Sequence, residues 1–136
     1  MLRYLLDTNI VIDVIKRRPP QALQQFNQHA GRMAISAITL AELLHGAERS
    51  GDSSANLAVV EDFCSRLQVL PYLLRAAQHD GAIRAALERL GTPIGVNDLH
   101  IAANARSEGL TLVTHNTREF ERVPALQFED WALDKG

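Results

Sequence analysis

Short apolar runs that stop at a polar residue alternate with helix-like stretches along this chain. The runs cover residues 2–6, 33–36, 68–70 and 110–114, and each has the length of a buried strand. Residues 125–128 are a candidate edge strand. Between them, apolar residues recur at intervals of three and four, which is typical of helices that pack on a core. Strands that alternate with helices indicate β-α units. We therefore expect an α/β fold with a mostly parallel central sheet and helices on both faces.

At 136 residues the chain has room for one ordinary domain, and no repeat, low-complexity stretch or linker divides it. We expect a single domain over residues 1–136. No apolar run approaches the roughly 18 residues of a membrane span, and the first run is too short for a signal peptide. The single cysteine, Cys64, excludes an internal disulfide and fits a reducing compartment. These features predict a cytoplasmic protein with no membrane contact.

Charge and aromatic content limit the ways in which the chain can bind nucleic acid. Lys and Arg number 14 and Asp and Glu number 16, so the net charge is −2 and charge alone would not hold RNA or DNA. Aromatic residues make up only 5%, which argues against a stacking platform for single strands. Any contact with nucleic acid is therefore expected to use a local patch.

Polar side chains stand at four of the expected junctions between strands and helices: Asp7, Glu42, Asp98 and Asn116. Taken one at a time, they have simple roles at helix starts. Thr39-x-x-Glu42 has the spacing of a capping box, and Asn116-x-x-Glu119 is a second signal of that type. Asp98, or Asn97 beside it, is a favourable N-cap for the Ala-rich segment that follows. The sequence pattern alone leaves these roles open beside a functional one.

Taken together, the same residues indicate a cation site. The carboxyl ends of parallel strands lie at one edge of a sheet, where α/β proteins bind ligands. If Asp7, Glu42 and Asp98 meet there, they raise one another's pKa unless a cation neutralises them. Three hard oxygen ligands suit Mg²⁺ or Mn²⁺. Zinc is disfavoured, because neither Cys64 nor any His falls at a recognisable ligand spacing.

Four segments in this order resemble the PIN-domain ribonucleases and, within them, the VapC toxins of bacterial toxin–antitoxin pairs. The segments are Leu5-Leu6-Asp7-Thr8-Asn9, Ile35-Ser36-x-x-Thr39-x-x-Glu42-Leu43-x-x-Gly46, Asn97-Asp98-x-x-Ile101-Ala102-Ala103-x-Ala105 and Val113-Thr114-x-Asn116-x-x-x-Phe120. The resemblance extends from about residue 3 to about residue 128, and residues 2–18 and 114–123 further resemble the enteric-type VapC subgroup. It implies a small PIN-like α/β/α sandwich around a parallel sheet, in agreement with the alternating pattern.

The resemblance also implies a catalytic set. By position, Asp7, Glu42 and Asp98 match the three metal-coordinating acids of the family. The fourth acidic position falls on Asn116, whose neutral amide can hold a second ion only weakly. The implied cofactor is Mg²⁺, with Mn²⁺ as the other candidate.

Further residues are implied to support this set. Thr8 and Asn9 match a pair that supports the first acid, and Thr114 matches a hydroxyl at the rim of the site. Arg118 and Arg122 are candidates for contacts with RNA phosphate, and an exposed helical pair is the alternative.

The implied activity is hydrolysis of an RNA phosphodiester, which inhibits translation. In the enteric-type subgroup the substrate is initiator tRNA, cut in the anticodon loop, and a compact folded RNA also suits a chain of low charge and few aromatics. The implied partner is a VapB-type antitoxin whose C-terminal segment covers the active site. The implied assembly is a homodimer within a larger complex that binds promoter DNA through the antitoxin. We expect the antitoxin groove near residues 10–30 and the helix over residues 54–67.

Other functions remain as alternatives. The same fold could cut mRNA or another RNA, or serve as an inactive scaffold. A receiver-like signalling domain needs a lysine after a late strand, but the only lysines are Lys16 and Lys135. A dehalogenase-type phosphatase needs Asp-x-Asp, whereas this chain has Asp7-Thr8-Asn9.

Overall fold

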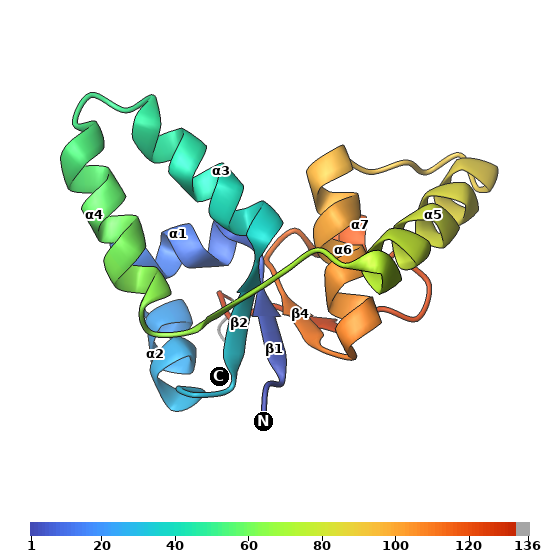
Figure 1. Cartoon of the computed structure of the whole chain (residues 1–136). Helices are drawn as coiled ribbons and strands as arrows, with labels where there is room; N and C mark the ends of the chain where they lie inside the picture. The colour runs from blue at the N-terminus through green and yellow to red at the C-terminus, as the bar shows by residue number, and fades with distance from the viewer. Residues whose placement is uncertain (133–136) are drawn as a thin grey trace.

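Five short strands form one parallel sheet in the computed structural model, which describes residues 1–132 (Figure 1). The strands are β1 (Tyr4–Leu6), β2 (Met33–Ser36), β3 (Gln68–Leu70), β4 (Thr111–Val113) and β5 (Phe128–Glu129). Their order across the sheet is β3-β2-β1-β4-β5, and each adjacent pair is parallel. In the register, Leu5 of β1 lies opposite Ala34 of β2 and Leu112 of β4. The α/β fold with a parallel sheet is therefore confirmed.

Helices fill the connections between the strands. Within the described residues they are α1 (Thr8–Lys16), α2 (Pro20–Gln28), α3 (Ala37–Glu48), α4 (Ser53–Cys64), α5 (Leu74–Arg89), α6 (Val96–Glu108) and the short α7 (Thr117–Phe120). None of the helices in residues 1–132 is long and apolar enough to cross a membrane.

The helices cover the two faces of the sheet as two separate cores. Because side chains alternate along a strand, Tyr4 and Leu6 of β1 face one way and Leu5 faces the other. Tyr4 and Leu6 pack with side chains of α1, α2, α3 and α4, whereas Leu5 packs with those of α5, α6 and α7. Figure 1 shows α1–α4 on one side of the sheet and α5–α7 on the other. The expected sandwich of helices, sheet and helices is what the chain forms.

The predicted strands agree with the structure most closely where an apolar run is cleanly bounded. The runs at residues 33–36 and 68–70 are β2 and β3. The edge strand expected at residues 125–128 is wrong in its bounds, since β5 begins only at Phe128. Ala125 has a positive φ of 60°, so the backbone there turns and cannot pair until it extends again.

The strand order places a crevice at the end of β1. After β1 the chain moves outward to β2 and β3, and it then crosses back to β4 on the other side of β1. Helices that follow neighbouring strands on opposite sides of such a reversal diverge, and ligands bind in the opening between them. In Figure 1, α3 and α6 leave this edge of the sheet on opposite sides of the end of β1. Asp7 follows β1 directly, Asn116 lies three residues after β4, and Glu42 lies on α3, which begins where β2 ends. Asp98 differs from these three, because it lies on α6, which follows α5 and not a strand.

Candidate active site

Asp7 lies at the centre of the candidate site. It follows β1, forms the N-cap of α1 and is only 3% exposed. Its carboxylate accepts hydrogen bonds from the backbone N–H of Thr8 and from Oγ1 of Thr114, each at 2.8 Å. Burial raises the pKa of Asp7 above its ordinary value, these two hydrogen bonds lower it, and the charge of Glu42 raises it again. The two hydrogen bonds thus offset only part of the cost of burying the charge of Asp7.

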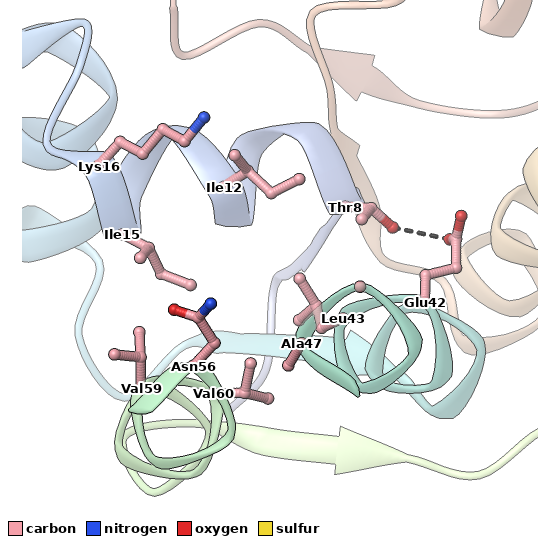
Figure 2. Close-up of a pocket in the computed structure, with 11 residues that line it drawn as sticks. Thr8, Ile12, Ile15, Lys16, Glu42, Leu43, Ala47, Asn56, Val59 and Val60 are labelled. Carbon is pink, nitrogen blue, oxygen red and sulfur yellow. Dashed lines mark hydrogen bonds between the residues drawn. The ribbon is translucent and has the colours of Figure 1, made fainter. Parts of the chain in front are cut away.

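Thr8 joins Asp7 to Glu42. Besides its backbone contact with Asp7, Thr8 donates from Oγ1 to Oε1 of Glu42 at 2.8 Å. Figure 2 shows this bond at the point where the start of α1 meets α3. Thr114 has a similar role on the other side of Asp7, because its Oγ1 also accepts the backbone N–H of Asn116 at 3.0 Å. The two threonines hold the first acid and its neighbours in fixed positions.

The capping roles considered for Glu42 and Asp98 are wrong. The N-cap of α3 is Ser36, whose side chain accepts from the N–H of Ile38, and Thr39 is a buried helix residue. The N-cap of α6 is Gly95, so Asp98 lies at the third position of that helix. Both helices begin earlier than the capping motifs predict, which leaves the carboxyl groups free for another role.

The pKa of Asp98 is raised by its surroundings. Burial is the main cause that raises its pKa, and a side-chain hydrogen bond with Glu119 is the next. The negative charges of Asp7, Glu119 and Glu42 add smaller contributions. Together they raise the pKa of Asp98 to about 7. The four acids therefore lie close enough to influence one another.

Glu119 is the residue that sequence reasoning missed. Its spacing from Asn116 predicts a box-like cap, but the structure shows no side-chain capping bond at the start of α7. Instead the carboxyl group of Glu119 meets that of Asp98, and its Oε2 is buried without a donor among the described residues. A carboxylate at the third position after Asn116 was the available signal, and it was interpreted as local capping.

The donor set fits a divalent cation. Asp7 and Asp98 have raised pKa values, the charges of neighbouring acids contribute to both, and Glu119 has a buried oxygen that lacks a donor among the described residues. A nearby positive charge stabilises such a group of carboxylates. All the oxygens are hard ligands of the type that Mg²⁺ and Mn²⁺ prefer. In residues 1–132, no three His, Cys, Asp or Glu side chains already stand arranged to enclose an ion. Asp98 and Glu119 interact with each other, so a bound ion would compete with that contact for their oxygens.

The remaining candidates make fewer contacts within the described residues. Asn116 is half-buried at the N-cap of α7, and only its backbone N–H takes part in the site. Asn9 is exposed and makes no side-chain hydrogen bond with the described residues. Arg118 and Arg122 are exposed and form no ion pair within residues 1–132. Both arginines are therefore available to a ligand at the rim.

His100, two residues after Asp98, belongs to a separate network. Its Nδ1 lies 2.9 Å from Oδ2 of Asp80 and 3.1 Å from the hydroxyl of Tyr72. Burial and the adjoining Asp80 raise the pKa of Tyr72 to about 12. This network links α5 to α6 on the side of α6 that faces away from the acids.

An apolar pocket of about 330 Å³ adjoins the acids (Figure 2). It lies between α1, α3 and α4, and Thr8 and Glu42 stand at one end. Its apolar wall comprises Ile12, Ile15, Leu43, Ala47, Val59 and Val60. Lys16 and Asn56 are the polar residues at the other end. The pocket is thus a surface groove that leads to the acidic cluster.

Comparison with known proteins agrees with this geometry. The sequence profile described as PIN domain matches residues 4–126. Over 131 residues the chain is 60% identical to ribonuclease VapC2 of Haemophilus influenzae, which covers 96% of this chain and 99% of the relative. The chain belongs to the VapC ribonucleases of the PIN domain family. Its membership rests on nearly the whole sequence, including every segment that forms the acidic cluster.

Two further members of the family extend the comparison. The tRNA(fMet)-specific endonuclease VapC of Shigella flexneri is 53% identical, over 97% of this chain and 100% of the relative. Among solved structures, the DNA-bound VapBC of Salmonella typhimurium contains a chain that superposes with a TM-score of 0.92 at 53% identity. That match covers 96% of this chain and 99% of the other. PIN-domain nucleases in general depend on a divalent metal, in agreement with the donor set.

Proposed function

We propose that this chain is the toxin of a toxin–antitoxin pair and that it hydrolyses one phosphodiester of a tRNA with the help of Mg²⁺. The observation that carries the proposal is the cluster around Asp98, in which burial and three neighbouring acids raise its pKa to about 7. A cluster of this type is costly to a protein that does not bind a cation. The names of the family members, ribonuclease and tRNA(fMet)-specific endonuclease, supply the reaction and the preferred substrate, initiator tRNA.

The acids and the two threonines of the site have different roles in the proposed reaction. Asp7, Glu42 and Asp98 would hold the ion, and Glu119 stands beside them where the sequence pattern had placed only Asn116. When bound, a divalent ion supplies positive charge to the scissile phosphate and favours ionisation of the attacking water. Thr8 and Thr114 fix the carboxylates through their hydroxyl groups, so that little reorganisation is needed.

The exposed rim supplies the contacts with RNA. Arg118 stands next to Glu119 on α7, and Arg122 lies one turn further along the chain. Guanidinium groups pair with phosphate through two parallel hydrogen bonds, which suits them to hold the RNA backbone against the acids. With a net charge of −2, the chain has no broad basic surface and needs a compact RNA that presents one strained or unpaired phosphodiester. The anticodon loop of a tRNA has that shape.

The apolar groove fits the antitoxin. Its position agrees with the expectation for residues 10–30 and 54–67, because α1 and α4 form two of its walls and α3 forms the third. A segment of the antitoxin that follows this groove reaches Glu42, and an arginine on that segment would take the place of the cation's charge. The solved VapBC complexes, some with promoter DNA, support a VapB-type partner and DNA binding through it. We further propose that the toxin forms a homodimer within that complex.

The deciding experiment incubates total tRNA with the purified chain, with Mg²⁺ or with EDTA, and maps the new 5′ ends. We expect one cut in the anticodon loop of one or a few tRNAs, lost with EDTA and restored by Mg²⁺ or Mn²⁺. Intact tRNA beside efficiently degraded mRNA would contradict the tRNA assignment. Equal cleavage by wild type and Asp7→Ala would contradict the active site itself.

A further inference from the structure

A second hollow adjoins the acidic cluster on the other side of α3. It has a volume of about 240 Å³ and is lined by Ile38, Ala41, Glu42, His45 and Asn97. Glu42 also lines the apolar groove of Figure 2, so this residue stands between the two cavities. The groove extends toward α1 and α4, whereas the second hollow extends toward the start of α6. Any strand of RNA whose phosphate reaches Glu42 therefore has this hollow within the length of one nucleotide.

The residues that line the hollow suit a planar ring that carries hydrogen-bonding groups along its edge. On α3, the lining residues follow one another at intervals of three and four, so they form one face of the helix. Ile38 and Ala41 give that face an apolar floor, and His45 adds an imidazole ring. Asn97, from the first turn of α6, closes the opposite side with an amide.

Neither polar side chain is engaged elsewhere in the described part of the chain. His45 and Asn97 are exposed, and neither has a side-chain hydrogen bond or ion pair within residues 1–132. An amide offers both donors and an acceptor, and an imidazole ring offers a face for stacking. The volume lies below the ~300–1,000 Å³ of pockets for drug-sized ligands, which suits a single planar ring system.

We propose that this hollow is a base subsite, which holds one unpaired nucleobase of the RNA next to the scissile phosphate. The proposal deepens the proposed function, on which it rests, because it assigns sequence preference to His45 and Asn97. The imidazole of His45 stacks on the base, and the Asn97 amide pairs with its edge. Asparagine pairs in a bidentate manner with the N6 and N7 atoms of adenine, so adenine is the expected base.

Binding of mononucleotides to the metal-free protein tests the subsite without any cleavage. We would titrate ¹⁵N-labelled chain in EDTA with AMP, UMP or ribose 5-phosphate. AMP should shift the side-chain amide of Asn97 and the backbone signal of Ala41 more than UMP does, and ribose 5-phosphate should shift neither. Equal shifts with ribose 5-phosphate would show that a phosphate, not a base, is recognised and would overturn the proposal. No shift with any ligand at millimolar concentration would also contradict it.

Cleavage of a tRNA anticodon hairpin tests the same residues in the reaction. Asn97→Ala and His45→Ala should each lower kcat/KM by roughly 10- to 100-fold through a higher KM, since one base contact is lost. The matched control is Gln24→Ala, which removes an exposed amide on α2 away from the acids and should match wild type. A hairpin with a single abasic nucleotide at the bound position should lower the kcat/KM of wild type by the same factor. Asn97→Ala should cleave this abasic hairpin as fast as wild type does, because the base that Asn97 would contact is missing.

The outcomes separate this subsite from the activity on which it rests. If wild type cleaves no RNA, the proposed function is wrong. If wild type cleaves the hairpin and both variants match it, the function stands and the base subsite is wrong. If the variants instead alter the oligomeric state by light scattering and leave cleavage unchanged, the hollow is part of a protein interface, which also overturns the proposal.

Discussion

At the scale of single residues, the position of Asp7 accounts for most of the site. It is almost fully buried, and its charge depends on two donors and on whatever cation approaches. Asp7→Asn keeps the size of the side chain but removes the charge, so cleavage of tRNA with Mg²⁺ should fall by at least about 100-fold. The circular dichroism spectrum should match that of wild type, because the amide oxygen still accepts the Thr8 N–H. Retained cleavage would contradict the role of Asp7.

Thr114 tests whether the support of the first acid matters. Thr114→Val removes the donor to a buried carboxylate, which should cost roughly 1–3 kcal/mol of stability and lower cleavage. Thr111→Val, at the start of the preceding strand β4, replaces a hydroxyl group that makes only a long 3.4 Å contact with exposed Gln127 and should cost little. Urea unfolding and initial rates of tRNA cleavage measure the two effects. Equal effects of both changes would show that Thr114 has no special role.

Asp98 gives a pH-dependent prediction for the metal-free protein. Its pKa is about 7 in the folded chain and 3.8 in the unfolded chain, so the folded chain binds the proton more tightly. This group therefore stabilises the fold fully below pH 3.8, and the contribution is lost as the pH rises through 7. In EDTA at pH 8, Asp98→Asn should have a Tm roughly 3 °C above wild type, since it has no charge to accommodate.

Thermal unfolding in EDTA from pH 4 to pH 8 measures this difference. The advantage of Asp98→Asn should shrink toward pH 4, where wild-type Asp98 is also neutral. Asp62→Asn, an exposed change on α4 that removes only a surface ion pair, is the control and should show no such trend. A constant difference between Asp98→Asn and wild type across the pH range would contradict the crowding of the acids.

At the scale of elements, the sequence predicts the order and type of the strands and helices better than their first residues. β2 and β3 could be predicted to the residue because β2 ends at the polar Ser36 and β3 is stopped by Pro71. The starts of α3 and α6 could not, because a capping motif is a local signal and the helix begins where the preceding segment allows. Ser36 ends β2 and caps α3 at once, so the later Thr39-x-x-Glu42 signal is left inside the helix.

The difference between local sequence signals and packing between elements also explains which site residues could be predicted from the sequence. Asp7 and Glu42 were predictable, since they follow the neighbouring strands β1 and β2, whose carboxyl ends lie at one edge of the sheet. Asp98 follows α5 and not a strand, so its place beside them could be predicted only from the resemblance to the PIN-domain family. Glu119 was not, because its contact with Asp98 depends on how α7 packs against α6, which no local spacing encodes. His45 belongs to no motif, and Asn97 stands in one only as the neighbour of Asp98. Only the structure brings α3 and the start of α6 together.

The groove between α1, α3 and α4 gives a prediction about the antitoxin. Val59 is 44% exposed and lines the groove, so Val59→Glu places a charge on the surface that the partner should cover. Binding of the antitoxin should weaken by at least about 10-fold, and co-expression should no longer rescue growth. Cleavage of tRNA by the free toxin should stay unchanged, because Val59 does not contact the acids.

Leu90→Glu is the matched control for this change. Leu90 is an exposed apolar residue at the C-terminal end of α5, outside the groove. Calorimetric titration of the two variants with the antitoxin should separate them clearly. Full rescue of growth by the antitoxin in the Val59→Glu strain would show that the groove is not its binding surface.

At the scale of the whole molecule, charge decides how RNA is held. A chain with 14 basic and 16 acidic side chains offers few phosphate contacts, and those at the active edge are Arg118 and Arg122. Each phosphate contact adds about 0.9 to the negative slope of log affinity against log salt on a duplex and about 0.7 on a single strand. Two contacts therefore predict a slope of roughly −1.4 to −1.8 for kcat/KM on tRNA at subsaturating substrate.

Arg118→Ala should reduce that slope by about 1 and weaken cleavage of every susceptible tRNA by a similar factor, because a phosphate contact carries no sequence information. Arg89→Ala, an exposed change at the end of α5, is the control and should leave the slope unchanged. Rates measured from 50 to 300 mM KCl at fixed Mg²⁺ give the slopes of all three proteins. A wild-type slope steeper than about −5 would require an extended basic track along the RNA. The low net charge would then be a poor guide to recognition, and the compact contact proposed between the rim arginines and a tRNA loop would be wrong.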